Sequence, residues 1–190
     1  MDARGVGQMR VLFGRQSLWA VLDSMVVIAT AERFGFDLYS PAGRLLRRIQ
    51  RPYTEVAVTQ ADAEKQIEVW VSSFPAGMEE RKRQFRDIFE RAPRPKTKPP
   101  YDRLIVSQTG EVWIREYGEP YSRERPGSYS VFDRTGQWLA QVAVPMGVDP
   151  KWIGAEELLG TWRDEDDVMH VRIYRIGKAG RREGGKAVGR

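Results

Sequence analysis

The fold is decided by two stretches of the chain, FDLYSPAGRLLRRIQRP at residues 36–52 and YSVFDRTGQWLAQVAVP at residues 129–145. They align without a gap at a constant offset of 93 residues, which pairs Tyr39 with Phe132. Each copy reads as an alternating strand, a turn that contains glycine, a second alternating strand and a final proline. A fixed offset between segments of matched residue classes is typical of a repeat fold.

A third copy of the first strand lies near the C-terminus. Residues 169–174, MHVRIY, match residues 127–132, GSYSVF, at an offset of 42 residues. On one face the three strands carry Phe36 and Leu38, Tyr129 and Val131, and Val171 and Ile173. On the other face they carry Tyr39, Phe132 and Tyr174. Because both faces are apolar, we predict that both are covered by neighbouring sheets.

A pair of strands is predicted upstream of each copy, at residues 18–22 and 25–29, 104–106 and 112–114, and 152–153 and 158–162. Asp23-Ser24 and Thr109-Gly110 suit the connecting turns, since glycine tolerates positive φ. Each unit then has four antiparallel strands in about 42 residues, a length typical of propeller blades. The third unit offers only three strands, and residues 8–13 read as a strand of a preceding unit.

The 93-residue offset between the first two copies exceeds one unit of about 42 residues, and this excess predicts a two-helix insertion at about residues 59–100. Thr59 can cap a helix with Asp62 and Glu64 in its first turn, and apolar residues follow at helical spacing at Ala63, Ile67, Trp70 and Phe74. A second helix is predicted over residues 78–92, with Pro93 ending it. We expect the pair to lie across one end of the blades as a cap or partner-docking arm. Deleting residues 59–93 should then leave the blades folded but weaken binding.

The 190 residues carry a net charge of +5, most of it in the last thirteen residues. There Lys178, Arg181, Arg182, Lys186 and Arg190 face the single anion Glu183. Residues 177–190 are also rich in glycine and poor in apolar residues, so we predict a disordered basic tail. Basic runs without interleaved aromatic residues are weak evidence for nucleic-acid binding, and no nucleic-acid partner is expected.

The chain contains no cysteine, which excludes disulfides, thiolate metal sites and cysteine nucleophiles. No stretch approaches 18 consecutive apolar residues, so no transmembrane segment is predicted. The first fifteen residues lack the apolar core of a signal peptide. Either the protein is cytoplasmic or its natural N-terminus lies outside this sequence.

The segment 129–145, the closing LLGTWRDEDDVMHVRIYRI at residues 158–176 and the helical insertion resemble the six-bladed β-propeller proteins abundant in some soil bacteria, which are similar to NHL and TolB-like propellers. The resemblance covers about residues 10–176. It implies an all-β fold for residues 1–176, a partial β-propeller of about three four-stranded antiparallel blades with a two-helix insertion. It also implies a cell-envelope or secreted location, and it carries over no catalytic motif.

A closed six-bladed ring needs about 250 residues or more, so this chain corresponds to the C-terminal half of such a ring. An arc of three blades leaves two blade faces and a strand edge exposed. We therefore expect the remaining blades, or self-association, to complete it.

The one histidine, His170, follows the acidic run at residues 164–167. Asp164, Asp166 and His170 are the candidate metal ligands, since alternating carboxylates suit calcium and a histidine beside them suits a metal or general-base role. The interpretation that we favour is structural: a hydrogen-bonded blade histidine and a solvated hairpin turn. No cofactor is predicted.

Two further groups of side chains have simple structural interpretations. Four tryptophans recur at strand positions and are predicted to pack within or between blades: Trp113, Trp138, Trp152 and Trp162. Arg47, Arg48 and Arg51 alternate with apolar residues and are predicted to face solvent on an edge strand.

Two classes of function follow. The first is a non-catalytic binding or scaffold module that recognises a protein, peptide or glycan partner. The alternative is a fragment of a propeller hydrolase or lactonase whose axial site is completed by missing blades. No acidic or histidine position repeats from unit to unit, which favours the binding module.

Overall fold

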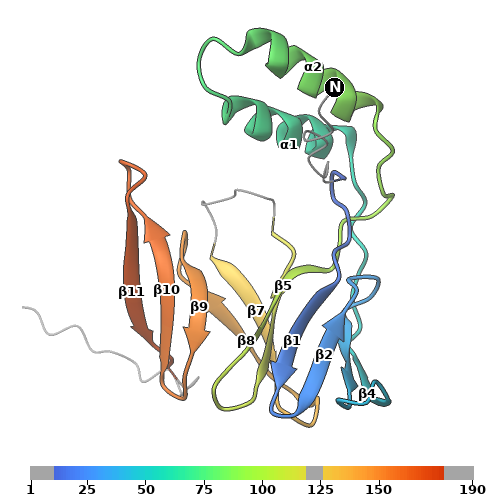
Figure 1. The fold of residues 1–190 in the computed structure, drawn as a ribbon, viewed down its shortest axis with the longest axis vertical. Helices are drawn as coiled ribbons and strands as arrows, with labels where there is room; N and C mark the ends of the chain where they lie inside the picture. Colours follow the sequence, from blue (N-terminus) through green and yellow to red (C-terminus); the bar gives the residue numbers. More distant parts are fainter. Residues whose placement is uncertain (1–10, 119–125, 178–190) are drawn as a thin grey trace, which may run out of the picture.

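The computed structural model describes residues 11–118 and 126–177, which form three antiparallel sheets and two helices (Figure 1). The sheets have four, four and three strands and follow one another in chain order. They are open sheets that stand side by side, with the helices beyond one end of the strands. Among the described residues no helix is long and apolar enough to cross a membrane.

The strands lie where the alternating pattern predicts them. The first sheet contains β1 (Leu18–Leu22), β2 (Met25–Ala29), β3 (Gly35–Tyr39) and β4 (Leu45–Gln50). The second contains β5 (Tyr101–Val106), β6 (Val112–Glu116), β7 (Gly127–Phe132) and β8 (Trp138–Val144). The third contains β9 (Asp149–Ile153), β10 (Glu157–Arg163) and β11 (Met169–Arg175), and its described part has no fourth strand.

The two long copies of the repeat also share their turn. Gly43 between β3 and β4 has φ 77°, and Gly136 between β7 and β8 has φ 86°. L-residues rarely adopt this left-handed conformation, which explains why each copy carries glycine at that place.

The three sheets stack with the same polarity. We call the side of a sheet that faces the next sheet in the chain its forward face, and the opposite side its rear face. The forward face of the first sheet buries Phe36 against Phe132 on the rear face of the second, with the ring centroids 5.5 Å apart. The forward face of the second sheet buries Tyr129 in a cluster that includes Tyr174 on the rear face of the third. Equivalent residues therefore lie at both junctions.

Three expectations about packing were wrong. Val171 and Ile173 on β11 are exposed, because no described sheet follows the third one. Trp113 is buried as predicted, whereas Trp138 and Trp152 are exposed.

Two predicted elements also end differently. Residues 11–13 form a turn rather than a strand, because Leu12 and Phe13 are buried against the helices, and residues 8–10 lie outside the described chain. The first helix ends at Ser72, so Phe74 lies beyond it.

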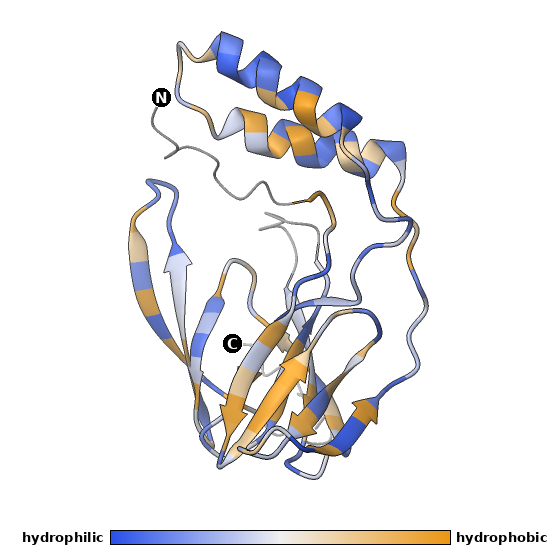
Figure 2. Ribbon diagram, turned by 45° about the vertical axis from the view of Figure 1, so that its right-hand side comes forward, coloured by the Kyte–Doolittle hydropathy of each residue, from blue (hydrophilic) through white to orange (hydrophobic). Residues whose placement is uncertain are grey.

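The helical arm consists of α1 (Gln60–Ser72) and α2 (Glu79–Arg91) on a short two-stranded stem. The stem is held by backbone hydrogen bonds between residues 56–58 and 96–98. The buried core of the arm contains Leu12, Phe13, Ala63, Ile67, Val71 and Phe89. Figure 2 shows hydrophobic bands on both helices of the arm. The arm thus buries its apolar surface against itself and the segment before β1; its role as a docking arm stays a prediction.

Asp62 joins the first helix to the stem. Its carboxylate accepts hydrogen bonds from Lys98 Nζ at 2.7 Å and from the Thr59 N–H at 2.9 Å, while Thr59 caps the helix in return. The hydrogen bond from Lys98 is the main reason why the pKa of Asp62 falls from 3.8 to about 2, and the bonds from Thr59 add to it.

Replacing Asp62 with asparagine is expected to lower the free energy of unfolding by about 1–2 kcal/mol at neutral pH. Because the carboxyl pKa is lower in the folded chain, the stabilisation is fully present above about pH 4 and is lost as the pH falls towards 2. Denaturation followed by the helical circular-dichroism signal at several pH values measures this. The exposed Glu64→Gln variant in the same turn is the control. A difference between Asp62→Asn and the native chain that persists unchanged at acid pH would contradict the assignment.

Candidate functional site

Of the predicted metal candidates, Asp164 and Asp166 lie in the turn between β10 and β11, and His170 lies at the start of β11. They stabilise the turn. Asp164 Oδ1 accepts the backbone N–H of Asp166 at 3.1 Å and of Val168 at 2.9 Å. Its other oxygen lies 2.6 Å from His170 Nε2. The bond to His170, followed by that from Val168, lowers the pKa of Asp164. Asp166 contributes its backbone N–H to this arrangement. Within residues 11–118 and 126–177, no group of three or more His, Cys, Asp or Glu side chains is placed to hold a metal.

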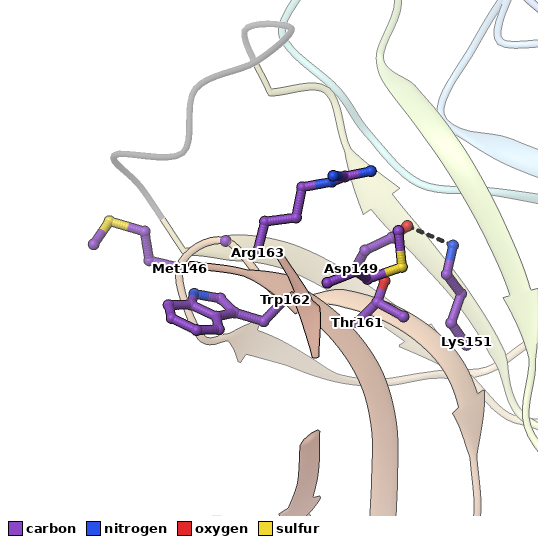
Figure 3. A pocket seen from close by; sticks show the side chains of 8 residues that line it. Met146, Asp149, Lys151, Thr161, Trp162 and Arg163 are labelled. Carbon is purple, nitrogen blue, oxygen red and sulfur yellow. Dashed lines mark hydrogen bonds and ion pairs between the residues drawn. The ribbon is translucent and has the colours of Figure 1, made fainter. Parts of the chain in front are cut away.

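A cavity with apolar and charged walls lies beside this turn, at one end of the third sheet. It encloses about 340 Å³ (Figure 3). The connection between β8 and β9, strands β9 and β10 and the start of β11 supply its lining, which comprises Met146, Gly147, Asp149, Lys151, Thr161, Trp162, Arg163 and Met169.

Trp162 is held in place by neighbours on the sheet and on the preceding turn. The Arg172 guanidinium lies 3.7 Å from the centroid of its ring. Gly147, with φ 74°, lets the turn approach so closely that a Cβ there would lie 3.2 Å from Trp162 Cδ1. The indole is therefore oriented before any ligand arrives, which reduces the entropy lost on binding.

Cations outnumber carboxylates at the cavity wall. Lys151 Nζ lies 2.7 Å from Asp149 Oδ2, and Asp149 also pairs with Arg103 of β5, which ties the second sheet to the third. Arg163 donates to the Asp167 carbonyl oxygen at 2.9 Å and lies 3.2 Å from that residue's carboxylate. Both cations are partly exposed and oriented, so they can meet an anionic group beside the apolar wall.

A second cavity of about 120 Å³ lies between the first sheet and the stem of the arm. Arg15, Glu32, Arg33, Phe34, Arg51, Tyr53, Glu55, Lys98 and Pro100 line it. Arg51 packs over the rings of Phe34 and Trp138 at 5.3 and 5.4 Å and lies 3.4 Å from Glu116. Its prediction as a solvent-facing residue was wrong, because it reaches across to the second sheet. Arg47 and Arg48 are exposed on the edge strand β4 as predicted.

The small cavity is the weaker candidate because it encloses about 120 Å³ rather than 340 Å³, and its cations, like those of the larger cavity, already have partners. Lys98 is bonded to Asp62, Arg15 donates to Thr97 at 3.1 Å, and Arg51 is held as described. The larger cavity on the third sheet joins two apolar methionines and a tryptophan to cations at its open rim, and we take it as the candidate site.

Sequence reasoning found only part of this site. The sequence pattern identified Trp162, but as a packing residue. It gave no indication of a role for Lys151 or Arg163. Pocket residues 146–151 and 161–169 come together through the pairing of β9 with β10, whose register shifts between Leu159 and Gly160. A register shift of this kind leaves the alternating pattern of the sequence nearly unchanged, so the sequence does not predict it.

No protein-family model matches this chain, and no curated protein sequence matches it significantly.

Proposed function

We propose that the chain is a non-catalytic binding module built as part of a β-propeller. Antiparallel sheets that follow in chain order, repeat the same turn and stack with one polarity support the propeller assignment. The enzyme alternative that the sequence left open stays a prediction, with no described feature that favours it.

The partner that fits the candidate site is a peptide segment with an apolar side chain next to a carboxylate. Trp162, Met146 and Met169 offer adaptable apolar contacts to the side chain. Lys151 and Arg163 also line the cavity and can pair with the carboxylate. This juxtaposition of a fixed tryptophan and two oriented cations is the observation that carries the proposal.

Selection of a displayed random-peptide library on the full chain tests the proposal. Peptides that carry an acidic residue beside an aromatic or aliphatic one should be enriched, and fluorescence polarisation then gives their affinities. Trp162→Ala should weaken binding at least about tenfold, as expected for an anchoring aromatic residue. Lys151→Ala, a change at an exposed side chain that leaves folding intact, should weaken the acidic peptides selectively.

The matched control is Trp138→Ala, which removes an exposed tryptophan of β8 outside the cavity and should leave the affinity unchanged. Equal binding to the native chain and to Trp162→Ala would overturn the proposal. So would selective capture of glycans by the native chain in a parallel glycan array, with no peptide enriched.

A further inference from the structure

Two apolar sheet faces lie at opposite ends of the stack. The rear face of the first sheet carries Trp19, Val21, Val26, Ile28 and Tyr39, which the pairing of β1, β2 and β3 places on one side. The forward face of the third sheet carries Trp152, Leu159, Thr161, Val171 and Ile173, which share a side through the pairing of β10 with β9 and β11. Exposed apolar surface this extensive is typical of an interaction surface.

The repeat indicates what each free face is shaped to contact. Phe36, Tyr129 and Val171 occupy equivalent positions at offsets of 93 and 42 residues. The first two are 3% and 1% exposed, whereas Val171 is 70% exposed. The missing neighbour of Val171 is therefore the rear face of another sheet of this kind.

The residue that Val171 would meet can be named from the junctions inside the chain. Phe36 contacts Phe132, and Tyr129 shares its cluster with Tyr174. Phe132 and Tyr174 are equivalent to Tyr39, the aromatic residue on the free rear face. By the same rule the partner of Val171 is Tyr39, but the two lie at opposite ends of the stack.

We infer that a second copy of this chain docks head to tail, so that the forward face of each third sheet covers the rear face of the partner's first sheet. Two such contacts join two copies into one ring of six sheets, within the range of about four to eight blades that closed propellers contain. A head-to-tail contact that closes in this way covers both free faces at once.

The charges beside the free faces are compatible with this contact. Arg48 makes a bidentate pair with Asp37 on the rear face, with distances of 2.9 and 3.0 Å. At the other end Glu157 lies opposite Arg175 across β10 and β11. Each of these charges has a neighbour of opposite sign on its own sheet, which limits the cost of burying it.

The proposed peptide site shares Thr161 with this forward face, so a docked second copy would compete with a bound peptide. The inference does not rest on that site, and its test uses other residues. Light scattering on the full chain, over a wide range of concentrations, should give twice the 21.8 kDa mass of one chain. Val171→Glu on the forward face and Val21→Glu on the rear face should each weaken dimerisation by about a hundredfold or more, because both contacts then bury a charge. Both residues are exposed, and circular dichroism verifies that the variants fold.

Mixing distinguishes this arrangement from a symmetric contact of like faces. A mixture of Val171→Glu with Val21→Glu contains one unaltered contact per pair and should regain part of the association. The control Leu139→Glu, an exposed change on β8 outside both faces, should dimerise like the native chain. A monomeric native chain, an open series of larger assemblies, or loss of association in only one of the two face variants would overturn the inference.

Discussion

Replacing Tyr101 with phenylalanine is expected to lower the free energy of unfolding by about 2–4 kcal/mol, because two buried backbone groups lose their partner. The Tyr101 hydroxyl accepts the Ala31 N–H at 2.8 Å and donates to the Gly35 carbonyl at 2.8 Å. It thus attaches the start of the second sheet to the first. Burial raises the pKa of this phenol, so it stays protonated and able to donate at neutral pH.

The measurement is denaturant unfolding of Tyr101→Phe beside Tyr53→Phe. Tyr53 is exposed and stacks on the same Phe34 ring that Tyr101 meets edge-on. Removing the Tyr53 hydroxyl should change the free energy of unfolding by no more than about 0.5 kcal/mol. Equal effects of the two deletions would show that the Tyr101 hydroxyl does not hold the sheets together.

Phe89→Ala is expected to destabilise the helical arm by about 3–5 kcal/mol. Phe89 is buried, with its ring centroid 4.4 Å from that of Phe85 and 5.0 Å from that of Trp70. The core of the arm is separate from the two cores between the sheets, so the loss should be local.

Amide hydrogen exchange should therefore show lost protection in α1 and α2 while β5–β8 stay protected. Ile88→Ala, which shortens an exposed side chain on the same helix, is the control and should leave the arm intact. Protection lost equally across the second sheet would mean that the arm belongs to the folding core of the sheets. That result would also contradict the prediction that residues 59–93 can be deleted without unfolding the sheets.

Much of the fold could be predicted because local rules and tertiary packing agree. Alternation with period two located the strands, and glycine at residues 43 and 136 located two of the turns. Thr59 and Asp62 formed the cap that their spacing predicts. By contrast, Leu12 and Phe13 read as strand because an apolar pair carries no sign of which neighbour will cover it.

The exposed faces and the candidate site could not be predicted for two different reasons. The pattern at Val171 and Ile173 predicts a face suited to burial, but a pattern cannot reveal whether any sheet covers it. The cavity around Trp162 depends on how β9 pairs with β10, and Arg51 reaches across to another sheet. These features depend on tertiary geometry, which residue spacing along one strand does not reveal.

The central claim is that three units of one repeat stack with a single polarity and leave complementary ends. Since the chain contains no cysteine, thiol cross-linking with a short bifunctional reagent tests it directly. We mix Tyr39→Cys chains with Val171→Cys chains and weigh the products by mass spectrometry. We expect a cross-linked pair that contains one chain of each variant, and no cross-link when either variant is treated alone. Cross-linking of one variant to itself, or a mixture that yields only single chains, would contradict head-to-tail stacking.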